Sequence, residues 1–567
     1  MGSGTNQALW VLNLKPRPSI ECSPPSAASP AGACAAQIFR RYHPPMRLLK
    51  IDCRAACALL IFSLTPHSVC LGQERSELWG EQGERWSADS RLPDWSFAGF
   101  ERGEGTIPTP APTHNVRDYG AVGDGEHDDT EAFRKAIAAA KRAVAEGAAA
   151  GVVRIPAGRY TITDRLDIRS SGVVLRGEGE GQTTLHFPRS LTDVEPNWSA
   201  TTTGRRTSNY SWSGGFVRVQ GRLTGPSLGA VGPALRGETV LPVAEPDRFE
   251  PGAEVMLSMS DDEEHSLTHY LYAGDPGPID NIGRQIRAEQ VFRVLAVDPE
   301  ASTVTLDRPL RFDVRAEWAP DLLVFRPTVT HVGVESMTME FPGDPYMGHF
   351  TELGYNGIAM SGVAHCWVRN IRFVNAESGV FFNGSFSTLD GLVFESEREP
   401  DRFGNQGHHA ITVTGTDNLT TGFDFRVRYI HDITVTRGSI GNVFASGRGV
   451  DVNFDHHRRG PYENLFTDID VGLGSRVWAS GGGAALGRHS AARGTFWNLR
   501  SERPIAPPGR NFAPPMINIV GVRSESAAST EADGLWFEPI DPEAMLPQNL
   551  HEAQRQRRLR TDAETPD

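Results

Sequence analysis

The feature that most constrains the fold is a short pattern that recurs between residues 330 and 520. Each copy opens with a small polar residue and continues with apolar residues at alternate positions, as in Asn370–Phe373 (NIRF). The further copies are Gly391–Phe394, Asp432–Val435, Asp468–Val471, Asn498–Leu499 and Asn518–Ile519. The closest copies lie 20 and 21 residues apart, a spacing typical of stacked coils. Because one coil cannot bury its apolar side alone, the pattern predicts a solenoid of strands with capped ends.

A helix is predicted ahead of these repeats. Asp128 followed by Glu131 has the spacing of a capping box, which marks a helix start. Apolar residues then recur at helical spacing until Gly147: Phe133, Ile137, Ala140 and Val144.

The segment Asn115–Ile137, NVRDYGAVGDGEHDDTEAFRKAI, resembles the opening signature of the pectate-lyase superfamily, of the rhamnogalacturonase/epimerase-like type. The resemblance implies that the helix caps the N-terminal end of a single-stranded right-handed parallel β-helix, an all-β fold. That superfamily includes lyases, hydrolases and phage tailspikes, so the resemblance implies little about the reaction.

Residues 190–330 break the repeat. The segments Arg236–Met259 and Gln290–Phe312 have the pattern of paired antiparallel strands, which predicts an inserted antiparallel β-domain. The predicted parts are an upstream extension with a signal peptide (1–72), a linker (73–112), the start of the β-helix with its cap helix (113–190), the inserted domain (191–329), the main β-helix (330–540), and a C-terminal helix and tail (541–567).

The N-terminal region has the layout of a secretory signal peptide. Met46–Gly72 begins with basic residues, continues with the apolar stretch Ala55–Leu64 and ends in small residues. Five of the six cysteines lie before residue 73 and only Cys366 follows, so no disulfide and no cysteine metal site is expected in the mature chain. We therefore expect a secreted or periplasmic protein without a membrane span.

The net charge and the choice of basic residues limit the classes of molecule that the protein is expected to bind. The net charge of −14 argues against a general nucleic-acid binder. After Lys50 only Lys135 and Lys141 remain, so arginine carries nearly all the positive charge. Arginine binds carboxylates in a bidentate fork, although codon usage would give the same bias. An acidic polysaccharide or oligosaccharide is the expected partner, and the oligomeric state stays open.

Histidines and arginines gather between residues 408 and 493, around the segment Val450–Phe466 (VDVNFDHHRRGPYENLF). Gly460 and Pro461 predict a coil corner directly after the clump Asp455–Arg459, and stacking would bring residues of the next coil beside it. The predicted catalytic residues are His456, His457, His489, Tyr462, Asp451 and Asp455. The predicted substrate-binding residues are Arg448, Arg458, Arg459, Arg493, His408, His409 and Trp497.

Strand parity predicts which side chains near the clump face outward. If Val450, Val452 and Phe454 point inward, then Asp451, Asn453 and Asp455 point outward. The same rule predicts that Asp468 and Asp470 point outward on the following strand.

Three functions remain open from the sequence. In β-elimination of a uronic-acid polymer, arginine holds the sugar carboxylate, a histidine removes the C5 proton, and Tyr462 protonates the leaving oxygen. A glycoside hydrolase would need two carboxylates, with Asp451, Asp455, Glu463, Asp468 and Asp470 as candidates. A glycan-binding protein without catalysis is the third possibility.

Simpler interpretations stand beside these functions. The clump could be a surface ion-pair network with Asp455 and Glu463, and Asp432 and Asn518 could belong to stacked ladders at turns. No cofactor is expected to be required and no metal ligands are assigned. Ca²⁺ could bind the acidic run Asp261–His265, although such runs are usually solvated loops.

Overall fold

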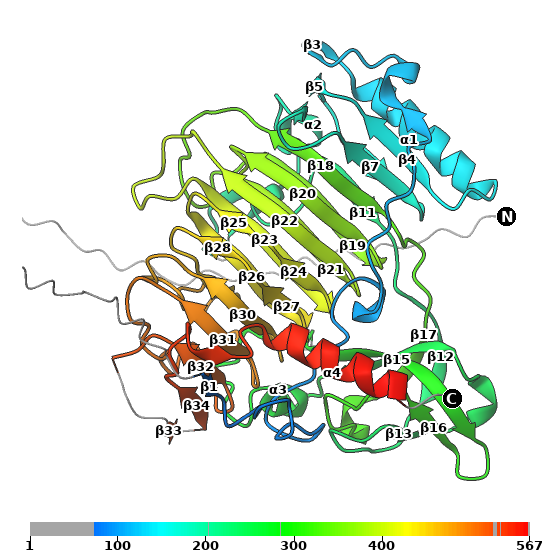
Figure 1. Cartoon of the computed structure of the whole chain (residues 1–567), viewed down its shortest axis with the longest axis vertical. Helices are drawn as coiled ribbons and strands as arrows, with labels where there is room; N and C mark the ends of the chain where they lie inside the picture. The colour runs from blue at the N-terminus through cyan, green and yellow to red at the C-terminus, as the bar shows by residue number, and fades with distance from the viewer. Residues whose placement is uncertain (1–72, 202, 284, 526–529, 533, 565–567) are drawn as a thin grey trace, which may run out of the picture. The chain divides into compact units, whose positions relative to one another are not determined.

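The computed structural model describes residues 73–201, 203–283, 285–525, 530–532 and 534–564. In this part of the chain most strands pair in parallel and stack as successive coils of a solenoid (Figure 1). The predicted all-β parallel β-helix is therefore confirmed. The predicted signal peptide and upstream extension lie outside the described residues.

One face of the solenoid is a seven-stranded parallel sheet. Its strands, in spatial order, are β29 (Phe454–His456), β26 (Tyr429–Ile440), β23 (Gly407–Thr416), β21 (Ser378–Ser385), β19 (Asn356–Ala364), β11 (Val217–Gln220) and β6 (Leu166–Ile168). Ile358, Val380, Ile411, Ile433 and Phe454 are in register on consecutive strands and are buried. Each coil thus covers the apolar side of its neighbour.

The remaining faces share a second set of strands. They are β2 (His114–Asn115), β3 (Asp124–Asp128), β4 (Gly151–Ile155), β5 (Gly158–Thr161), β7 (Val173–Gly177), β8 (Thr183–His186), β18 (Gly333–Glu340), β20 (Trp367–Val374), β22 (Thr388–Glu395), β24 (Leu419–Thr421), β25 (Asp424–Phe425), β27 (Val443–Ala445), β28 (Arg448–Gly449), β30 (Leu465–Asp470), β31 (Thr495–Arg500), β32 (Asn518–Val522), β33 (Thr530–Ala532) and β34 (Leu535–Glu538). Strand β18 pairs with β7 in its first half and with β8 in its second half. The longer strands therefore turn a corner in their middle.

The corner explains the small polar residue that opens several of the sequence repeats. Asn370, Gly391, Asp468 and Asn498 adopt the left-handed conformation, with φ of 52°, 64°, 57° and 57°. Glycine, asparagine and aspartate enter this region at the least cost. The repeating residue is thus selected by backbone geometry at the bend.

Side-chain ladders run along the solenoid, both at predicted positions and at others, and Asn518 donates to Thr495 of the neighbouring coil (Nδ2–Oγ1 3.0 Å). Asn418 donates to Asn442 (Nδ2–Oδ1 2.9 Å), and Asn442 donates to Asn464 (3.2 Å). Asp432 exchanges hydrogen bonds with Asn453 on the next coil, at 2.8 and 2.9 Å. A ladder role for Asp432 is therefore supported.

Helix α1 (Thr130–Ala145) packs on β2, β4, β6 and β7 at the N-terminal end of the solenoid (Figure 1). The predicted helix is confirmed, but its predicted capping box is wrong. The N-cap is Asp129, whose side chain makes no cap hydrogen bond. Its carboxylate accepts instead from the backbone N–H groups of Val122 and Gly123, while Asp128 accepts from the N–H of Thr130.

Residues 73–112 were predicted to be a linker, and this prediction is wrong. Trp79, Leu92 and Trp95 are buried in one apolar cluster with Val443 and Leu465 of the solenoid. Strand β1 (Glu74–Arg75) also pairs in parallel with β35 (Met545–Leu546). The segment is thus packed against the body of the protein.

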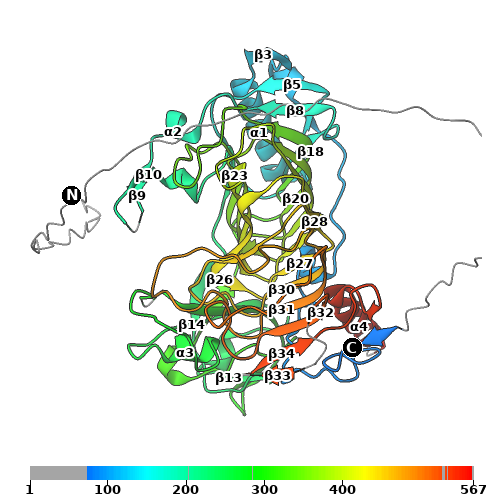
Figure 2. The ribbon, with the colours of Figure 1, turned by 90° about the vertical axis from the view of Figure 1, so that its left-hand side faces the viewer.

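The inserted domain is a six-stranded antiparallel sheet, as predicted, although it begins later than residue 191. Its strands, in spatial order, are β12 (Thr224–Ala230), β17 (Asp321–Phe325), β14 (Glu254–Ser260), β15 (Arg287–Asp298), β16 (Thr303–Leu306) and β13 (Val240–Pro242). Strand β11 before it still belongs to the solenoid, so the insertion starts after Gln220. A second excursion is the hairpin of β9 (Trp198–Ala200) and β10 (Arg206–Ser208) (Figure 2).

A buried ionic network joins the inserted domain to the solenoid. Asp417 accepts from Arg308 at 2.6 Å and from Arg311 at 2.8 Å. Arg311 also donates to Glu463 at 3.0 Å. All four side chains are at most 6% exposed. The ion pairs therefore compensate these charges in place of the water that burial removes.

The other helices are short, except for the C-terminal one. They are α2 (Leu191–Val194), α3 (Ser266–Leu271), α4 (Leu550–Glu564) and the 3-10 helices η1 (Phe100–Gly103), η2 (Val116–Tyr119), η3 (Asn209–Ser211), η4 (Pro246–Arg248) and η5 (Ala316–Trp318). Within the described residues, none of the helices has the length and apolar character needed to cross a bilayer.

Candidate active site

A cleft of about 600 Å³ lies on the side of the solenoid that carries β23, β26 and β29. Its lining comes from the β9–β10 hairpin and the residue after η3, the loop before β19, strands β23 and β26, the turn after β29, and the loop that follows β30. The lining residues are Ala200, Thr201, Trp212, His349, Phe350, His408, His409, Thr436, His457, Arg459, Gly481, Gly482, Gly483 and Leu486. Imidazole rings are its dominant polar groups.

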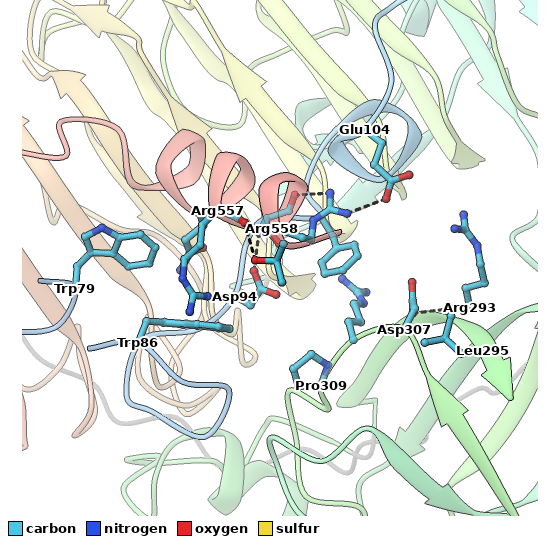
Figure 3. Close-up of a pocket in the computed structure, with 15 residues that line it drawn as sticks. Trp79, Trp86, Asp94, Glu104, Arg293, Leu295, Asp307, Pro309, Arg557 and Arg558 are labelled. Carbon is cyan, nitrogen blue, oxygen red and sulfur yellow. Dashed lines mark hydrogen bonds and ion pairs between the residues drawn. The ribbon is translucent and has the colours of Figure 1, made fainter. Parts of the chain in front are cut away.

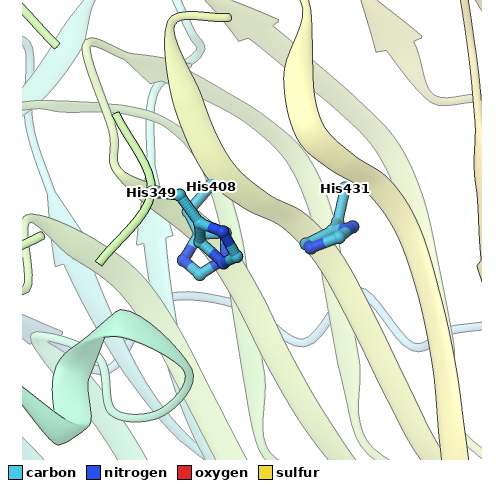
Figure 4. Close-up of side chains that lie close together, drawn as sticks. All are labelled: His349, His408 and His431. Atoms are coloured by element: carbon cyan, nitrogen blue, oxygen red, sulfur yellow. The ribbon is translucent and has the colours of Figure 1, made fainter. Parts of the chain in front are cut away.

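Strand stacking brings the histidines together. His409 and His431 are register partners on β23 and β26, and their rings stack with centroids 4.7 Å apart. The ring of His408 lies 4.1 Å from that of His409. His349, from the loop before β19, adds a ring 4.6 Å from His408 (Figure 4). Residues up to 82 positions apart in the sequence thus form one cluster.

Asp455 and His457 form a hydrogen-bonded pair at the edge of this cluster. Asp455 Oδ2 accepts from Nδ1 of His457 at 2.9 Å, and Oδ1 accepts from the backbone N–H of Gly481 at 2.7 Å. The carboxylate is fully buried, whereas the side chain of His457 is 35% exposed. With Nδ1 held by the carboxylate, Nε2 of His457 is the ring nitrogen that is left for chemistry in the cleft.

Electrostatics separate His457 from the other rings. Burial would lower the pKa of His457, but the charge and hydrogen bond of Asp455 outweigh it, so its pKa lies above the ordinary value. Burial lowers the pKa of His431 to about 4 despite Asp455. Burial and the neighbouring rings also hold the pKa values of His408 and His409 well below the usual range. His457 is therefore the ring of this group that can exchange a proton near neutral pH.

A buried carboxyl group lies behind His408. Glu352 Oε1 is 3.3 Å from Nδ1 of His408 and accepts from the hydroxyl of Tyr346 at 2.6 Å. Burial, together with the nearby charge of Glu377, raises the pKa of Glu352 to about 7. Glu352 therefore lies beside the His408 ring without a hydrogen bond to it.

Another cavity, of about 390 Å³, lies beside α4 and the inserted domain (Figure 3). Two of its four arginines are engaged in ion pairs: Arg558 with Glu104 at 2.8 Å and Arg308 with Asp417 at 2.6 Å. Within the part of the chain that the structure describes, no histidine lines this cavity, so the histidine cleft is the stronger candidate for proton-transfer chemistry.

One protein-family model matches a segment near the start of the β-helix. The family model "Rhamnogalacturonase A/epimerase, pectate lyase-like" matches residues 113–208, and the strands that follow continue the same parallel stack. The start of the chain thus resembles this pectate-lyase-like family of parallel β-helix proteins. The predicted resemblance is thereby confirmed.

The relatives of this β-helix protein match it over short stretches. Mannuronan C5-epimerase AlgE3 of Azotobacter vinelandii is 35% identical over 106 residues, which is 18% of this chain and 5% of the epimerase. Alginate lyase 7 of the same organism is 32% identical over 106 residues, or 12% of its length. The tailspike gp49 of Pseudomonas phage LKA1 superposes on 75% of this chain and 69% of its own, with a TM-score of 0.35 and 15% identity.

The β-helix brings five of the predicted site residues to the cleft. His408, His409, His457 and Arg459 line it, and Asp455 lies directly behind His457. Asp455 leaves its strand on the outward side, as parity predicts, but the loop at Gly481 covers it. The guanidinium of Arg459 has no ion pair with any described residue, so it remains available to an anion.

Two residues of the central clump serve other purposes. His456 points into the interior, where its ring lies 4.9 Å from Phe512 and 5.3 Å from Phe466. The prediction that His456 faces the cleft is therefore wrong, because parity places it on the same side as Phe454. Arg458 donates to the carbonyl of Gly487 and to Nε2 of His489.

His489, Tyr462 and Arg493 were also predicted for the site, and each is used within the protein. Nδ1 of His489 lies 3.0 Å from the carbonyl of His456. Tyr462 is fully buried against Phe312 of the inserted domain and accepts from Arg493 at 2.6 Å. Tyr462 is thus remote from the cleft lining and unsuited to protonate a leaving group.

The remaining predicted positions lie elsewhere on the β-helix. Asp451 was predicted to face solvent, but it is 4% exposed and accepts from the N–H and hydroxyl of Ser475. Arg448 pairs with Asp424, and Trp497 donates to the carbonyl of Pro547. Arg448 and Trp497 lie on strands of the second set, as do Asp468 and Asp470, and none of these four residues lines the cleft.

The alternative that the clump forms a surface ion-pair network with Asp455 and Glu463 is wrong for Glu463. Glu463 is fully buried and pairs with Arg311 of the inserted domain. It is therefore unavailable to the clump and to a hydrolytic carboxylate pair.

The acidic run Asp261–His265 acts at the start of α3. Asp261 accepts from the hydroxyl of Thr268 at 2.6 Å and lies 2.7 Å from Nδ1 of His265. Asp262 accepts from the N–H of Ser266 at 2.7 Å. Both aspartates are thus engaged by their own turn, and Ca²⁺ binding at this run stays a possibility that the sequence raised.

Sequence reasoning missed His349, Glu352, His431 and Gly481 as site residues. A signal existed for His431, because it follows His409 by 22 residues, the same interval that separates Ile411 from Ile433. The other three lie in loops whose path across the strands leaves no periodic trace in the sequence.

Proposed function

We propose that this β-helix protein is a secreted enzyme that cleaves a uronic-acid-containing polysaccharide by β-elimination. The carrying observation is the Asp455–His457 pair, which opens onto a cleft that also holds the unpaired guanidinium of Arg459. Secretion is supported by the signal-peptide pattern of Met46–Gly72.

The pair has the arrangement of a general base. Asp455 holds Nδ1–H of His457, which keeps the ring orientation and tautomer fixed and directs Nε2 at the substrate. Nε2 removes the C5 proton of a uronic acid residue, and the electron pair forms the C4–C5 double bond as the bond to the glycosidic oxygen breaks. The imidazolium then carries the proton that the leaving oxygen requires.

Arg459 supplies the charge that this reaction needs. Removal of the C5 proton places negative charge on the carboxylate of the same sugar residue, and a guanidinium can bind both carboxylate oxygens. The names of two relatives refer to mannuronan and alginate, which supports an acidic polysaccharide as the substrate class.

The lining of the cleft favours this reaction over hydrolysis. A glycoside hydrolase requires two carboxylates on either side of the scissile bond. Among the described residues that line the cleft there is no aspartate or glutamate, and Asp455 is covered by Gly481. The chemistry of the cleft is therefore carried by imidazole.

The test is incubation with a panel of acidic polysaccharides while ultraviolet absorbance is recorded, since the double bond left by β-elimination absorbs there. Wild type is expected to raise the absorbance on at least one polymer. His457→Ala should lower the rate by about a hundredfold or more, and His269→Ala, at an exposed histidine of α3, should not. New reducing ends without any rise in absorbance would replace the proposal by hydrolysis.

A further inference from the structure

We infer that His349, His408 and His431 form a binding site for a divalent transition-metal ion of the Zn²⁺ class. Each of the three offers a ring nitrogen, and these nitrogens all lie within 4.8 Å of one another. Three imidazoles are a frequent ligand set of catalytic zinc. No repeat pattern in the sequence indicates this site, because His349 reaches it from a loop (Figure 4).

Each of the two buried imidazole rings has a carboxyl group close to it, as histidine ligands of metal ions often do. Nδ1 of His408 lies 3.3 Å from Glu352, and Nδ1 of His431 lies 3.2 Å from Asp455. A carboxylate behind each imidazole is the usual support of a histidine ligand. Neither of these approaches is a hydrogen bond, so each of the two rings still has a nitrogen available for an ion.

Nδ1 and Nε2 of both His408 and His431 lack a hydrogen-bond partner among the described residues, although the two side chains are only 2% and 6% exposed. An unsatisfied polar group in such a position costs free energy. A bound cation would satisfy one nitrogen of each ring at once.

A second set, His431 with Asp455 and His457, also lies within ligand distance. There the oxygens of Asp455 already accept from Gly481, Thr434 and His457. Because this carboxylate is occupied and both sets need His431, we assign the ion to the set with His349.

The site is open on one side. His349 is exposed and lines the cleft beside His408, so the ion has an entry path and a coordination position that faces the cleft. Zn–N bonds of about 2.0–2.1 Å in tetrahedral geometry need nitrogens roughly 3.3 Å apart. A small movement of the loop that carries His349 would close the set.

An oxygen ligand from the cleft would complete the coordination, either water or the carboxylate of an acidic sugar. The binding site itself does not depend on the proposed reaction. Metal binding and turnover can therefore succeed or fail separately.

The test uses untagged full-length protein, stripped with a chelator and dialysed against Zn²⁺ or Co²⁺. We expect one ion per chain by elemental analysis, and visible absorption bands of tetrahedral Co²⁺. His349→Ala removes an exposed ligand, and it should weaken binding by about a hundredfold or more. His269→Ala, which removes an exposed histidine outside the cleft, should bind as wild type does.

Thermal unfolding gives a second readout. Zn²⁺ should raise the unfolding midpoint of wild type and of His269→Ala more than that of His349→Ala. Equal zinc binding by wild type and His349→Ala, or no stoichiometric binding by wild type, would overturn the inference. Zinc binding without turnover on any acidic polymer would overturn the proposed function alone.

Discussion

The ionic network at Asp417 allows a prediction whose size follows from burial. Asp417→Asn removes the charge that neutralises Arg308 and Arg311, which are 2% and 6% exposed. Arg311 keeps the charge of Glu463, but Arg308 is left with neutral partners, the carbonyl of Val291 and nearby phenylalanine rings. Leaving a charge buried and uncompensated costs about 3–5 kcal/mol.

This loss of unfolding free energy can be expressed as a decrease in the unfolding midpoint temperature. An unfolding entropy of about 2.1 cal/mol/K per residue gives roughly 1 kcal/mol/K for a folded unit of roughly 500 residues. Asp417→Asn should therefore lower the unfolding midpoint by about 3–5 °C in scanning calorimetry at a fixed rate.

The chain offers a matched control on its surface. Asp424 also holds two arginines, Arg426 and Arg448, but these are 50% and 68% exposed. An exposed pair contributes about 0–1 kcal/mol, so Asp424→Asn should shift the midpoint by about 1 °C or less. Equal shifts for the two variants would refute the view that the buried network stabilises the junction of the inserted domain.

Three further predictions concern the cleft and the buried histidines. Gly481→Ala places a Cβ 2.7 Å from Cε1 of His457 and 2.9 Å from Cε1 of His431, so kcat/KM should fall by about a hundredfold at an unchanged melting temperature; wild-type kinetics would show that the rings need not hold their positions. His489→Ala should reduce kcat/KM less than His457→Ala, since Nδ1 and Nε2 of His489 already contact the protein; the reverse order would make His489 the base. His551 is buried with its pKa lowered by burial from 6.5 to about 4, so the unfolded chain binds a proton that the folded chain does not and stability falls as pH falls from 6.5 towards 4. His551→Gln should remove about 3 kcal/mol of this acid sensitivity, measured as melting temperature against pH, and an unaltered acid limb would contradict the assignment.

The solenoid could be predicted because its determinants are local and periodic. The apolar alternation fixes which residues enter the core, and the left-handed corner selects the small polar residues Asn370, Gly391, Asp468 and Asn498. Neither depends on contacts between distant segments.

The site could be predicted only in part. The pairing of His409 with His431 follows from the length of one coil, whereas His349 is brought in by a loop that crosses several strands. The inward direction of His456 follows from parity with Phe454. The burial of Asp455 does not, because the loop at Gly481 that covers it obeys no repeat.

The central claim is that His457 removes the C5 proton of a uronic acid residue. The most direct measurement is nuclear magnetic resonance of the products formed in D₂O from the polymer found in the absorbance screen. We expect the reacted residue to have lost its C5 proton and to carry a C4–C5 double bond, with wild type and not with His457→Ala. Products whose reacted residue keeps its C5 proton and gains a hydroxyl group from solvent would contradict the claim.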